Sequence, residues 1–305
     1  MSQSTWKDLP FPAVLRIEPA ASCNFRCIHC PTGLGLAPAG IMSAETFAAV
    51  YEKIKKYYFR VIVLFHGGEP LLNKNFGLMV QQVRPLAGMI KINTNGSLLD
   101  EKHIEMLLGC GIDKIMVSLD GVSPEENNEI RVGSDFHKII TSIKKLLDLK
   151  AERRLYKPEI HLHNNQIAGR RNPGGIKLPQ YIIDALGEYY GQVKWDDVSW
   201  AYIWPGLPLK TPDIKPDRNF CDSVINTLTI RWNGDVVPCC NDLTSKMIMG
   251  NALGEDLETI WNNEKYKKLR ADIHDFNPPD LCRNCYVLYP SKLMTRKDFE
   301  RLRLL

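Results

Sequence analysis

The feature that most constrains the fold of this chain is a repeated alternation of short β-rich runs and longer helical patterns. The β-rich runs lie at residues 14–17, 61–65, 89–92, 114–117, 159–162 and 198–201. Helical patterns lie between them, near residues 44–57, 75–86, 100–109, 136–150 and 178–190, and we expect Ser43 and Asp135 to be N-caps. Strand followed by helix, repeated, predicts parallel strands joined by crossover helices.

The number of strands limits how far such a sheet can close. Six strands are too few for a closed eight-stranded barrel, so we expect an α/β fold built as an open, partial (β/α)6 barrel. Ligands of such folds bind beyond the carboxyl ends of the strands. The proline-rich segment 204–216 indicates a linker. It predicts a partial-barrel domain over residues 12–205 and a small C-terminal domain over residues 206–305, in which Asn233 and Gly234 form a type I′ hairpin turn.

Charge and hydropathy argue against several classes of partner. Lysine plus arginine exceed aspartate plus glutamate by 39 − 35 = 4 residues, and the charges are interspersed, which gives little support for nucleic-acid binding. No apolar stretch is long enough to cross a bilayer, and the first residues lack the apolar core of a signal peptide. We therefore expect a cytoplasmic protein without a nucleic-acid or membrane partner.

The nine cysteines are grouped, not scattered. Three lie within residues 23–30, five lie between Cys221 and Cys285, and Cys110 stands alone. Thiols of cytosolic proteins are kept reduced, so metal ligation or redox chemistry is a better interpretation than structural disulfides. The grouping predicts two thiolate sites that are far apart in the sequence.

The first cysteine group lies in the loop directly after the first predicted strand. Cys23, Cys27 and Cys30 are separated by three residues and then by two. Three thiolates can bind three irons of a [4Fe–4S] cluster, and one iron stays open because no fourth cysteine occurs before Cys110. A zinc site is the alternative, although zinc usually takes four ligands from paired half-sites.

This group resembles the CxxxCxxC motif of the radical S-adenosylmethionine (radical SAM) superfamily. Gly67, Gly68 and Glu69 follow the second strand, where the family has its GGE element. The resemblance implies that this element is a backbone cradle for the methionyl amino group of S-adenosylmethionine. Glycines there would permit positive φ angles and the close approach of a ligand. An ordinary turn is the alternative interpretation.

Polar residues also end the next two strands, in the order that the resemblance predicts. Asn93 and Asn95 close the third strand, and Ser118 and Asp120 close the fourth. In relatives, such residues resemble contacts to the ribose hydroxyls and the methionine carboxylate. Turn chemistry alone is the alternative for Asn95 and Asp120.

One arginine extends this set of predicted contacts. Arg131 is similar to a family arginine that pairs with the methionine carboxylate, a bidentate geometry that suits a guanidinium. A solvated surface charge is the alternative. By the same resemblance, the open iron binds S-adenosylmethionine, and one electron yields methionine and a 5′-deoxyadenosyl radical that abstracts hydrogen from substrate. A reductant such as flavodoxin or ferredoxin would supply that electron.

The second cysteine group contains enough thiolates for one further cluster. These are Cys221, Cys239, Cys282 and Cys285. They can saturate an auxiliary [4Fe–4S] cluster, or alternatively bind zinc. The segment resembles the auxiliary-cluster extension called SPASM. The full pattern needs seven cysteines, and none follows Cys285, so the chain is closer to the shortened "twitch" form with one auxiliary cluster.

The adjacent cysteines Cys239 and Cys240 cannot both easily bind one cluster corner. The spacing from Gly234 favours Cys239 as the ligand. Cys240 then becomes a candidate hydrogen donor to a substrate radical, as radical epimerases need. The alternatives for Cys240 are a buried small residue or a substitute ligand.

The substrate is expected at the end of the fifth strand. Its polar residues could hydrogen-bond a polyol or an amino sugar; they are His161, His163, Asn164, Asn165 and Gln166. Because the first predicted strand begins at residue 14, we expect no separate N-terminal peptide-recognition domain. We therefore expect oxidation or epimerisation of a carbohydrate, an aminocyclitol or a similar small molecule. The alternatives are radical modification of a peptide or protein side chain, and a non-catalytic iron–sulfur or zinc protein.

Overall fold

The structure is a computed structural model that describes residues 8–166, 178–200, 204–205, 207, 215–283 and 285–289. Its strands are β1 (Val14–Ile17), β2 (Arg26–Cys27), β3 (Phe59–Val63), β4 (Ala87–Thr94), β5 (Lys114–Ser118), β6 (Arg131–Val132), β7 (Glu159–Gln166), β8 (Lys194–Trp200), β9 (Thr227–Ile230), β10 (Asp235–Val237) and β11 (Gly250–Asn251). Its α-helices are α1 (Ala44–Ile54), α2 (Phe76–Val83), α3 (Glu101–Gly109), α4 (Pro124–Ile130), α5 (Phe136–Glu152), α6 (Gln180–Leu186), α7 (Asp222–Asn226), α8 (Leu257–Trp261) and α9 (Glu264–His274). Short 3₁₀ helices are η2 (Pro70–Leu72), η3 (Arg84–Leu86), η4 (Gly187–Gln192) and η5 (Asp280–Cys282).

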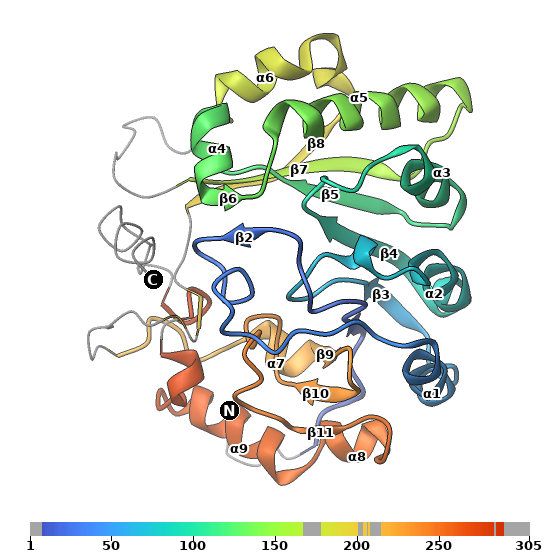
Figure 1. Cartoon of the computed structure of the whole chain (residues 1–305). Coiled ribbons are helices and arrows are strands. Elements are labelled where there is room, and N and C mark those ends of the chain that lie inside the picture. Colours follow the sequence, from blue (N-terminus) through green and yellow to red (C-terminus); the bar gives the residue numbers. More distant parts are fainter. Residues whose placement is uncertain are drawn as a thin grey trace.

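Six parallel strands follow one another across the main sheet in chain order. The full order is β11-β10-β9-β1-β3-β4-β5-β7-β8, and every pair from β1 to β8 is parallel. Helices α1, α2, α3 and α5 cover the outer side of this curved sheet (Figure 1). The strand–helix alternation of the sequence is thus confirmed as an α/β fold. In the described part of the chain, no helix is both long and apolar enough to span a membrane.

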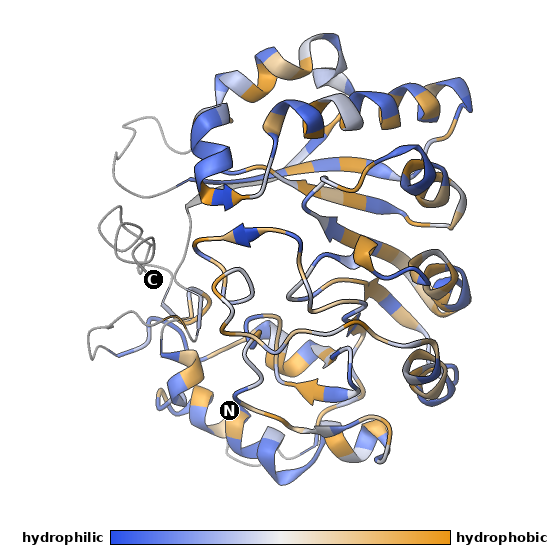
Figure 2. Cartoon of the chain, viewed as in Figure 1, coloured by the Kyte–Doolittle hydropathy of each residue, from blue (hydrophilic) through white to orange (hydrophobic). Residues whose placement is uncertain are grey.

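The parallel strands present an apolar face to the helices and a more polar face to the interior. On β1, Leu15 and Ile17 are fully buried in the core, whereas the intervening Arg16 is only partly buried. On β5, Ile115 and Val117 belong to the same core. Hydrophobic and hydrophilic residues also alternate along strand β7, as Figure 2 shows. The period of two places one class of side chain on each face of the sheet.

Helix starts are set by the expected capping residues. The Ser43 hydroxyl accepts a hydrogen bond from the Thr46 amide at 3.1 Å, and the Asp135 carboxylate accepts one from the Lys138 amide at 3.1 Å. Each cap pairs a helix N–H group that has no partner within the helix. Both predicted N-caps are confirmed.

The C-terminal segment extends the main sheet. Strand β9 pairs in parallel with β1, with Val14 opposite Thr227 and Ile17 opposite Ile230. The sequence pattern does not predict this pairing, because the two strands are more than 200 residues apart. The predicted domain boundary near residue 206 lies outside the described residues, and the division into two domains stays a prediction.

The hairpin predicted at residues 229–237 is present, but its turn type is not the expected one. Gly234 has a φ of +86°, whereas Asn233 is not among the described residues with positive φ. A type I′ turn needs positive φ at both central residues, so that prediction is wrong. The Gly234 amide instead donates to the Arg231 carbonyl at 2.9 Å, which closes a turn of ordinary handedness before a left-handed glycine.

A buried carboxylate connects the end of β1 to the C-terminal hairpin. Glu18 accepts hydrogen bonds from the His66 ring at 3.0 Å, the Gly67 amide at 3.0 Å and the Arg231 Nε at 2.9 Å. Burial alone would raise its pKa, but the charges and hydrogen bonds of His66 and Arg231 lower it from 4.5 to about 2. The carboxylate is therefore stabilised in its ionised form inside the protein.

Replacing Glu18 is expected to destabilise the fold strongly. Glu18→Gln removes the charge opposite the buried Arg231 guanidinium, and breaking such a pair costs about 3–5 kcal/mol of unfolding free energy. Because the folded-state pKa lies below the unfolded one, the charge stabilises the fold fully above pH 4.5. That contribution is lost as the pH falls from 4.5 towards 2. Urea unfolding as a function of pH measures both effects.

The matched control is Glu101→Gln, which removes an exposed carboxylate 3.2 Å from the Lys145 ammonium. We expect this variant to change the unfolding free energy by less than about 0.5 kcal/mol. Equal stability of the two variants at pH 7 would contradict the role given to Glu18.

Candidate functional site

The loop that carries the first cysteine group is held by backbone contacts on both sides. Its strand-proximal part donates from the Ala21 and Ser22 amides to the Gly40 carbonyl, at 2.8 and 3.0 Å. The Ser22 carbonyl accepts from the Glu69 amide at 2.9 Å. A Cβ on Gly68 would lie 2.3 Å from the Ser22 carbonyl oxygen, so only glycine allows this approach.

The glycines of the Gly-Gly-Glu element do not adopt the positive φ angles that glycine permits. Gly67 and Gly68 are absent from the described residues with positive φ. The close approach that we expected from them does occur, but the partner is the backbone of the cysteine loop. The glycines therefore bring residues 67–69 against that loop.

The three thiols of the first group lie close enough to influence one another. Burial raises the pKa of Cys27 to about 12, and the neighbouring Cys30 and Cys23 thiolates add to this rise while Arg131 opposes it. Burial also raises the pKa of Cys23. A bound cation removes this penalty, because a coordinating thiol is deprotonated by its metal. The three thiols are thus suited to a charged metal cluster.

The buried Glu69 side chain accepts hydrogen bonds from residues at the end of β4 and from the segment that follows Glu69 in the chain. One carboxylate oxygen accepts from the Thr94 hydroxyl at 2.8 Å and the Leu71 amide at 3.2 Å. The other accepts from the Asn95 amide at 2.7 Å. Burial raises the pKa of this carboxyl, although these hydrogen bonds oppose the rise. Glu69 thereby joins the cradle after β3 to the end of β4.

Asn95 continues this connection to the cysteines. Its amide nitrogen donates to the Asn24 side chain at 2.8 Å and lies 3.8 Å from the Cys23 sulfur. Its oxygen accepts from the amide and the hydroxyl of Ser97. Nearby, the Ser118 hydroxyl donates to the Asn93 oxygen at 3.0 Å. The structure thus brings Asn95 next to the cysteine loop and Ser118 next to Asn93 on the neighbouring strand.

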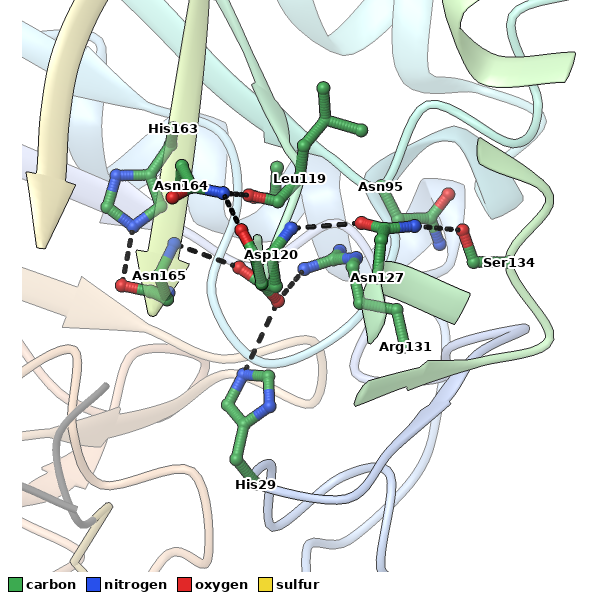
Figure 3. Close-up of polar contacts among 12 residues, drawn as sticks. His29, Asn95, Leu119, Asp120, Asn127, Arg131, Ser134, His163, Asn164 and Asn165 are labelled. Atoms are coloured by element: carbon green, nitrogen blue, oxygen red, sulfur yellow. Dashed lines mark hydrogen bonds and ion pairs between the residues drawn. The ribbon is translucent and has the colours of Figure 1, made fainter. Parts of the chain in front are cut away.

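Arg131 and Asp120 form a buried ion pair with each other (Figure 3). Arg131 Nη1 donates to Asp120 Oδ2 at 2.8 Å, and the short β2–β6 ladder places Arg131 opposite Cys27. Burial would lower the pKa of Arg131, but Asp120 and the cysteines raise it above its usual range. The Arg131 Nε is buried and has no hydrogen-bond partner among the described residues.

Asp120 is anchored from several other directions. Asn165 donates its amide to Asp120 Oδ1 at 3.2 Å, and the Asp120 amide donates to the Asn127 side chain at 2.9 Å. His29 Nε2 lies 3.9 Å from Asp120 Oδ2. Burial would raise the pKa of Asp120, but Arg131 and His29 lower it below its ordinary value. The sequence analysis missed Asn127, which gave no signal, and His29, which lies within the cysteine motif.

The polar side chains at the end of β7 alternate between the two faces of the strand. Asn164 is fully buried and donates to the carbonyls of Leu119 and Gly121, at 2.9 and 3.0 Å. Gln166 donates to Asn164 and is also buried. His163 Nε2 lies 3.2 Å from the Asn165 oxygen, and the His163 Nδ1 is buried without a partner (Figure 3). The described contacts of Asn164 and Gln166 are structural, whereas His163 retains an unused ring nitrogen.

The five cysteines of the second group come together in the structure. The pKa of Cys239 is raised well above its usual value by burial and by four neighbouring thiols. Those four are Cys240, Cys282, Cys285 and Cys221. Cys240 is the most exposed of the five, since the other four are buried. This arrangement fits the predicted ligand set, and as before, metal binding would offset the cost of burying thiolates.

A side chain that the sequence analysis missed hydrogen-bonds one of these sulfurs. Asn241 Nδ2 donates to the Cys285 sulfur at 3.2 Å, and Asn241 is buried. Its position directly after Cys240 in the sequence could have indicated that it lies near the cysteines. Among the described residues, no three His, Cys, Asp or Glu side chains converge to hold a single metal ion. The thiolates of a [4Fe–4S] cluster bind different irons and need not converge on one point.

Two family models match this chain. The model described as "Radical SAM superfamily" matches residues 17–162, and the model described as "Iron-sulfur cluster-binding domain" (SPASM) matches residues 221–286. The first runs from Ile17, the last residue of β1, to Leu162 in β7, and it includes the first cysteine group. The second begins at Cys221 and ends one residue after Cys285.

Two curated relatives match along most of their length. The tungsten-containing aldehyde ferredoxin oxidoreductase cofactor-modifying protein of Pyrococcus furiosus is 26% identical over 312 residues, which cover 89% of this chain and 86% of that protein. The S-adenosyl-L-methionine-dependent 2-deoxy-scyllo-inosamine dehydrogenase of Niallia circulans is 25% identical over 283 residues, which cover 90% and 92%.

A solved structure shares the fold. The crystal structure of BtrN in complex with AdoMet and 2-DOIA matches with a TM-score of 0.60 at 22% identity, over 90% of this chain and 93% of that chain. The two family models show that this chain belongs to the radical S-adenosylmethionine superfamily, is of the SPASM type, and has S-adenosyl-L-methionine and [4Fe–4S] clusters as its cofactors.

Proposed function

We propose that this radical SAM enzyme abstracts hydrogen from a small polar molecule and thereby oxidises or epimerises it. The observation that carries the proposal is the polar inner face of the parallel strands. Strand register places Arg16, Asn93, Ser118 and His163 on that face, and the apolar residues between them pack into the helices. An interior lined in this way suits a hydroxylated substrate.

We assign a separate role to each of the residues around the first cysteine group. Cys23, Cys27 and Cys30 would hold the site-differentiated cluster, and the backbone of Gly67 and Gly68 would face the methionyl amino group. When bound, the cluster and S-adenosylmethionine together supply the 5′-deoxyadenosyl radical. Glu69, Asn95 and the Asp120–Arg131 pair hold the loop in place.

We also propose which residues contact S-adenosylmethionine. Arg131 keeps its buried, unpartnered Nε available for an acceptor such as the methionine carboxylate. The other predicted contacts lie at the ends of β4 and β5, where ligands of parallel sheets bind. They are Asn93, Asn95, Ser118 and Asp120. Asp120 and Asn95 already have several protein partners, so we assign them to positioning these groups.

The second cysteine group bears on the outcome of the reaction. Cys221, Cys239, Cys282 and Cys285 would bind one auxiliary cluster, which can accept an electron during an oxidation. A relative that covers most of the chain is named as a dehydrogenase of a cyclitol amine, which supports oxidation of a small molecule. Cys240, partly exposed beside this group, supports epimerisation as the second outcome.

The proposal as a whole is tested by cluster content and radical formation. Cys27→Ala is expected to reduce the iron content of the anaerobically reconstituted protein from about eight to about four irons per chain. 5′-Deoxyadenosine formation with a chemical reductant should fall to background, because the cluster that binds S-adenosylmethionine is lost.

The control for this experiment is Cys110→Ala, which removes a buried thiol at the end of α3. This variant should keep about eight irons and its 5′-deoxyadenosine formation. Wild-type protein that contains zinc and no iron after reconstitution would contradict the proposal.

A variant of Cys240 distinguishes oxidation from epimerisation. If the enzyme is an epimerase, Cys240→Ala in deuterated water should abolish deuterium incorporation at the inverted carbon, because the thiol exchanges with solvent and supplies the hydrogen. Mass spectrometry of the product measures this loss. Turnover and incorporation that are unchanged in the variant would remove Cys240 from the mechanism.

Asn241 is expected to adjust the auxiliary cluster. A hydrogen bond to a ligand sulfur stabilises the more negative, reduced cluster and raises its reduction potential. Asn241→Leu removes the donor to Cys285 at similar volume and should lower that potential. A redox titration followed by electron paramagnetic resonance measures it, and the cluster at Cys23, Cys27 and Cys30 serves as the internal control. An auxiliary potential equal to that of the wild type would show that the hydrogen bond has no such effect.

A further inference from the structure

Two polar side chains that have no hydrogen-bond partner among the described residues lie on the inner face of the sheet, where β9, β1 and β3 meet. Strand register places Arg16 beside Val63 on one neighbour and beside Thr229 on the other. Leu15 and Ile17 point to the helical side and belong to the core, so Arg16 faces the interior. It lies two residues before Glu18, the residue that leads into the cysteine loop.

The Arg16 guanidinium has no acceptor among the described residues. Its Cζ lies 5.2 Å from the centroid of the Phe65 ring, and its Nε is buried without a hydrogen-bond partner. The Thr229 side chain is fully buried, and its hydroxyl oxygen also lacks a partner. Native proteins rarely leave a buried donor without an acceptor, because the group gives up its hydrogen bond to water and gains none in return.

The carboxylate of Glu18, two residues further along the chain, does not neutralise this charge. Glu18 Oε1 accepts from His66 and from the Gly67 amide, and Glu18 Oε2 accepts from Arg231 and from the Trp232 amide at 3.3 Å. Both oxygens are therefore used in the network that holds the cradle. Arg16 remains an uncompensated positive charge on the wall of the interior.

We propose that Arg16, with Thr229 beside it, binds an anionic group of the substrate, either a carboxylate or a phosphate. A guanidinium matches both groups through paired N–H donors, and a hydroxyl can add a further hydrogen bond. The inference rests on the proposed function and specifies its substrate class. It favours an acidic or phosphorylated polyol over an amino sugar, because an ammonium group would be repelled by Arg16.

Binding to the reconstituted, S-adenosylmethionine-loaded enzyme tests the assignment without requiring turnover. The probes are glucuronate, glucose 6-phosphate, glucose and glucosamine, which share a ring and differ in charge. Isothermal titration calorimetry should show that at least one anionic probe binds more tightly than glucose and glucosamine. Comparison of the two anionic probes separates the carboxylate from the phosphate.

Two variants and one matched control complete the experiment. Arg16→Gln should weaken binding of the preferred anionic probe at least tenfold, as expected for a charge-assisted hydrogen bond of about 1.5–3 kcal/mol. Arg16→Lys, which keeps the charge, should lose less affinity. Arg60→Gln removes an exposed arginine from the neighbouring strand β3 and should leave the affinity unchanged.

Several results would overturn the proposal. They are equal binding of charged and neutral probes, no binding of either anionic probe at millimolar concentration, and unchanged affinity in Arg16→Gln. Weaker binding of S-adenosylmethionine itself in Arg16→Gln would instead place Arg16 in the cofactor site. Failure of the proposed function is distinguishable, because it would appear as absent 5′-deoxyadenosine formation in the wild type whatever the probes do.

Discussion

The buried carboxylate of Glu18 is the interaction on which the arrangement of the two cysteine groups depends. It lies at the end of β1, immediately before the loop with the first group, and it binds His66, the Gly67 amide and Arg231. These partners come from the cradle after β3 and from the hairpin of the C-terminal segment. One ionised group therefore sets the distance between the cysteine loop, the cradle and the segment that carries the second group.

This network is extended by close backbone packing that only small residues allow. The Trp232 ring lies against Gly40, where an added Cβ would be 2.3 Å from a ring atom. Gly40 in turn accepts hydrogen bonds from Ala21 and Ser22 at the start of the cysteine loop. The loop is thus fixed between the hairpin on one side and the Gly67–Glu69 cradle on the other. Such a loop is preorganised to keep three thiolates in place before a cluster binds.

The sequence predicts the local features of this molecule and misses the distant ones. Strand positions, the caps at Ser43 and Asp135, and the grouping of cysteines follow from periodicity and spacing, which act over a few residues. The pairing of β9 with β1 and the Glu18–Arg231 ion pair join residues more than 200 positions apart, and no local pattern specifies them. The prediction of a type I′ turn at Asn233 and Gly234 is wrong because an Asn-Gly dipeptide does not show that the loop has one residue more than a two-residue turn.

Two arginines of the barrel show how compensation of charge separates a positioning role from a binding role. Arg131 is opposed by Asp120 at 2.8 Å, and both lie within a network that includes Asn165 and Asn127. Its charge is largely balanced before any ligand arrives, so it can order the loop and still offer its one unpartnered Nε. Arg16 has an aromatic ring beside it and no carboxylate partner in the part of the chain that the structure describes. A charge that the protein leaves unbalanced on an interior wall contributes most when an anion binds there, and the proposal that the substrate carries an anionic group rests on this difference between Arg16 and Arg131.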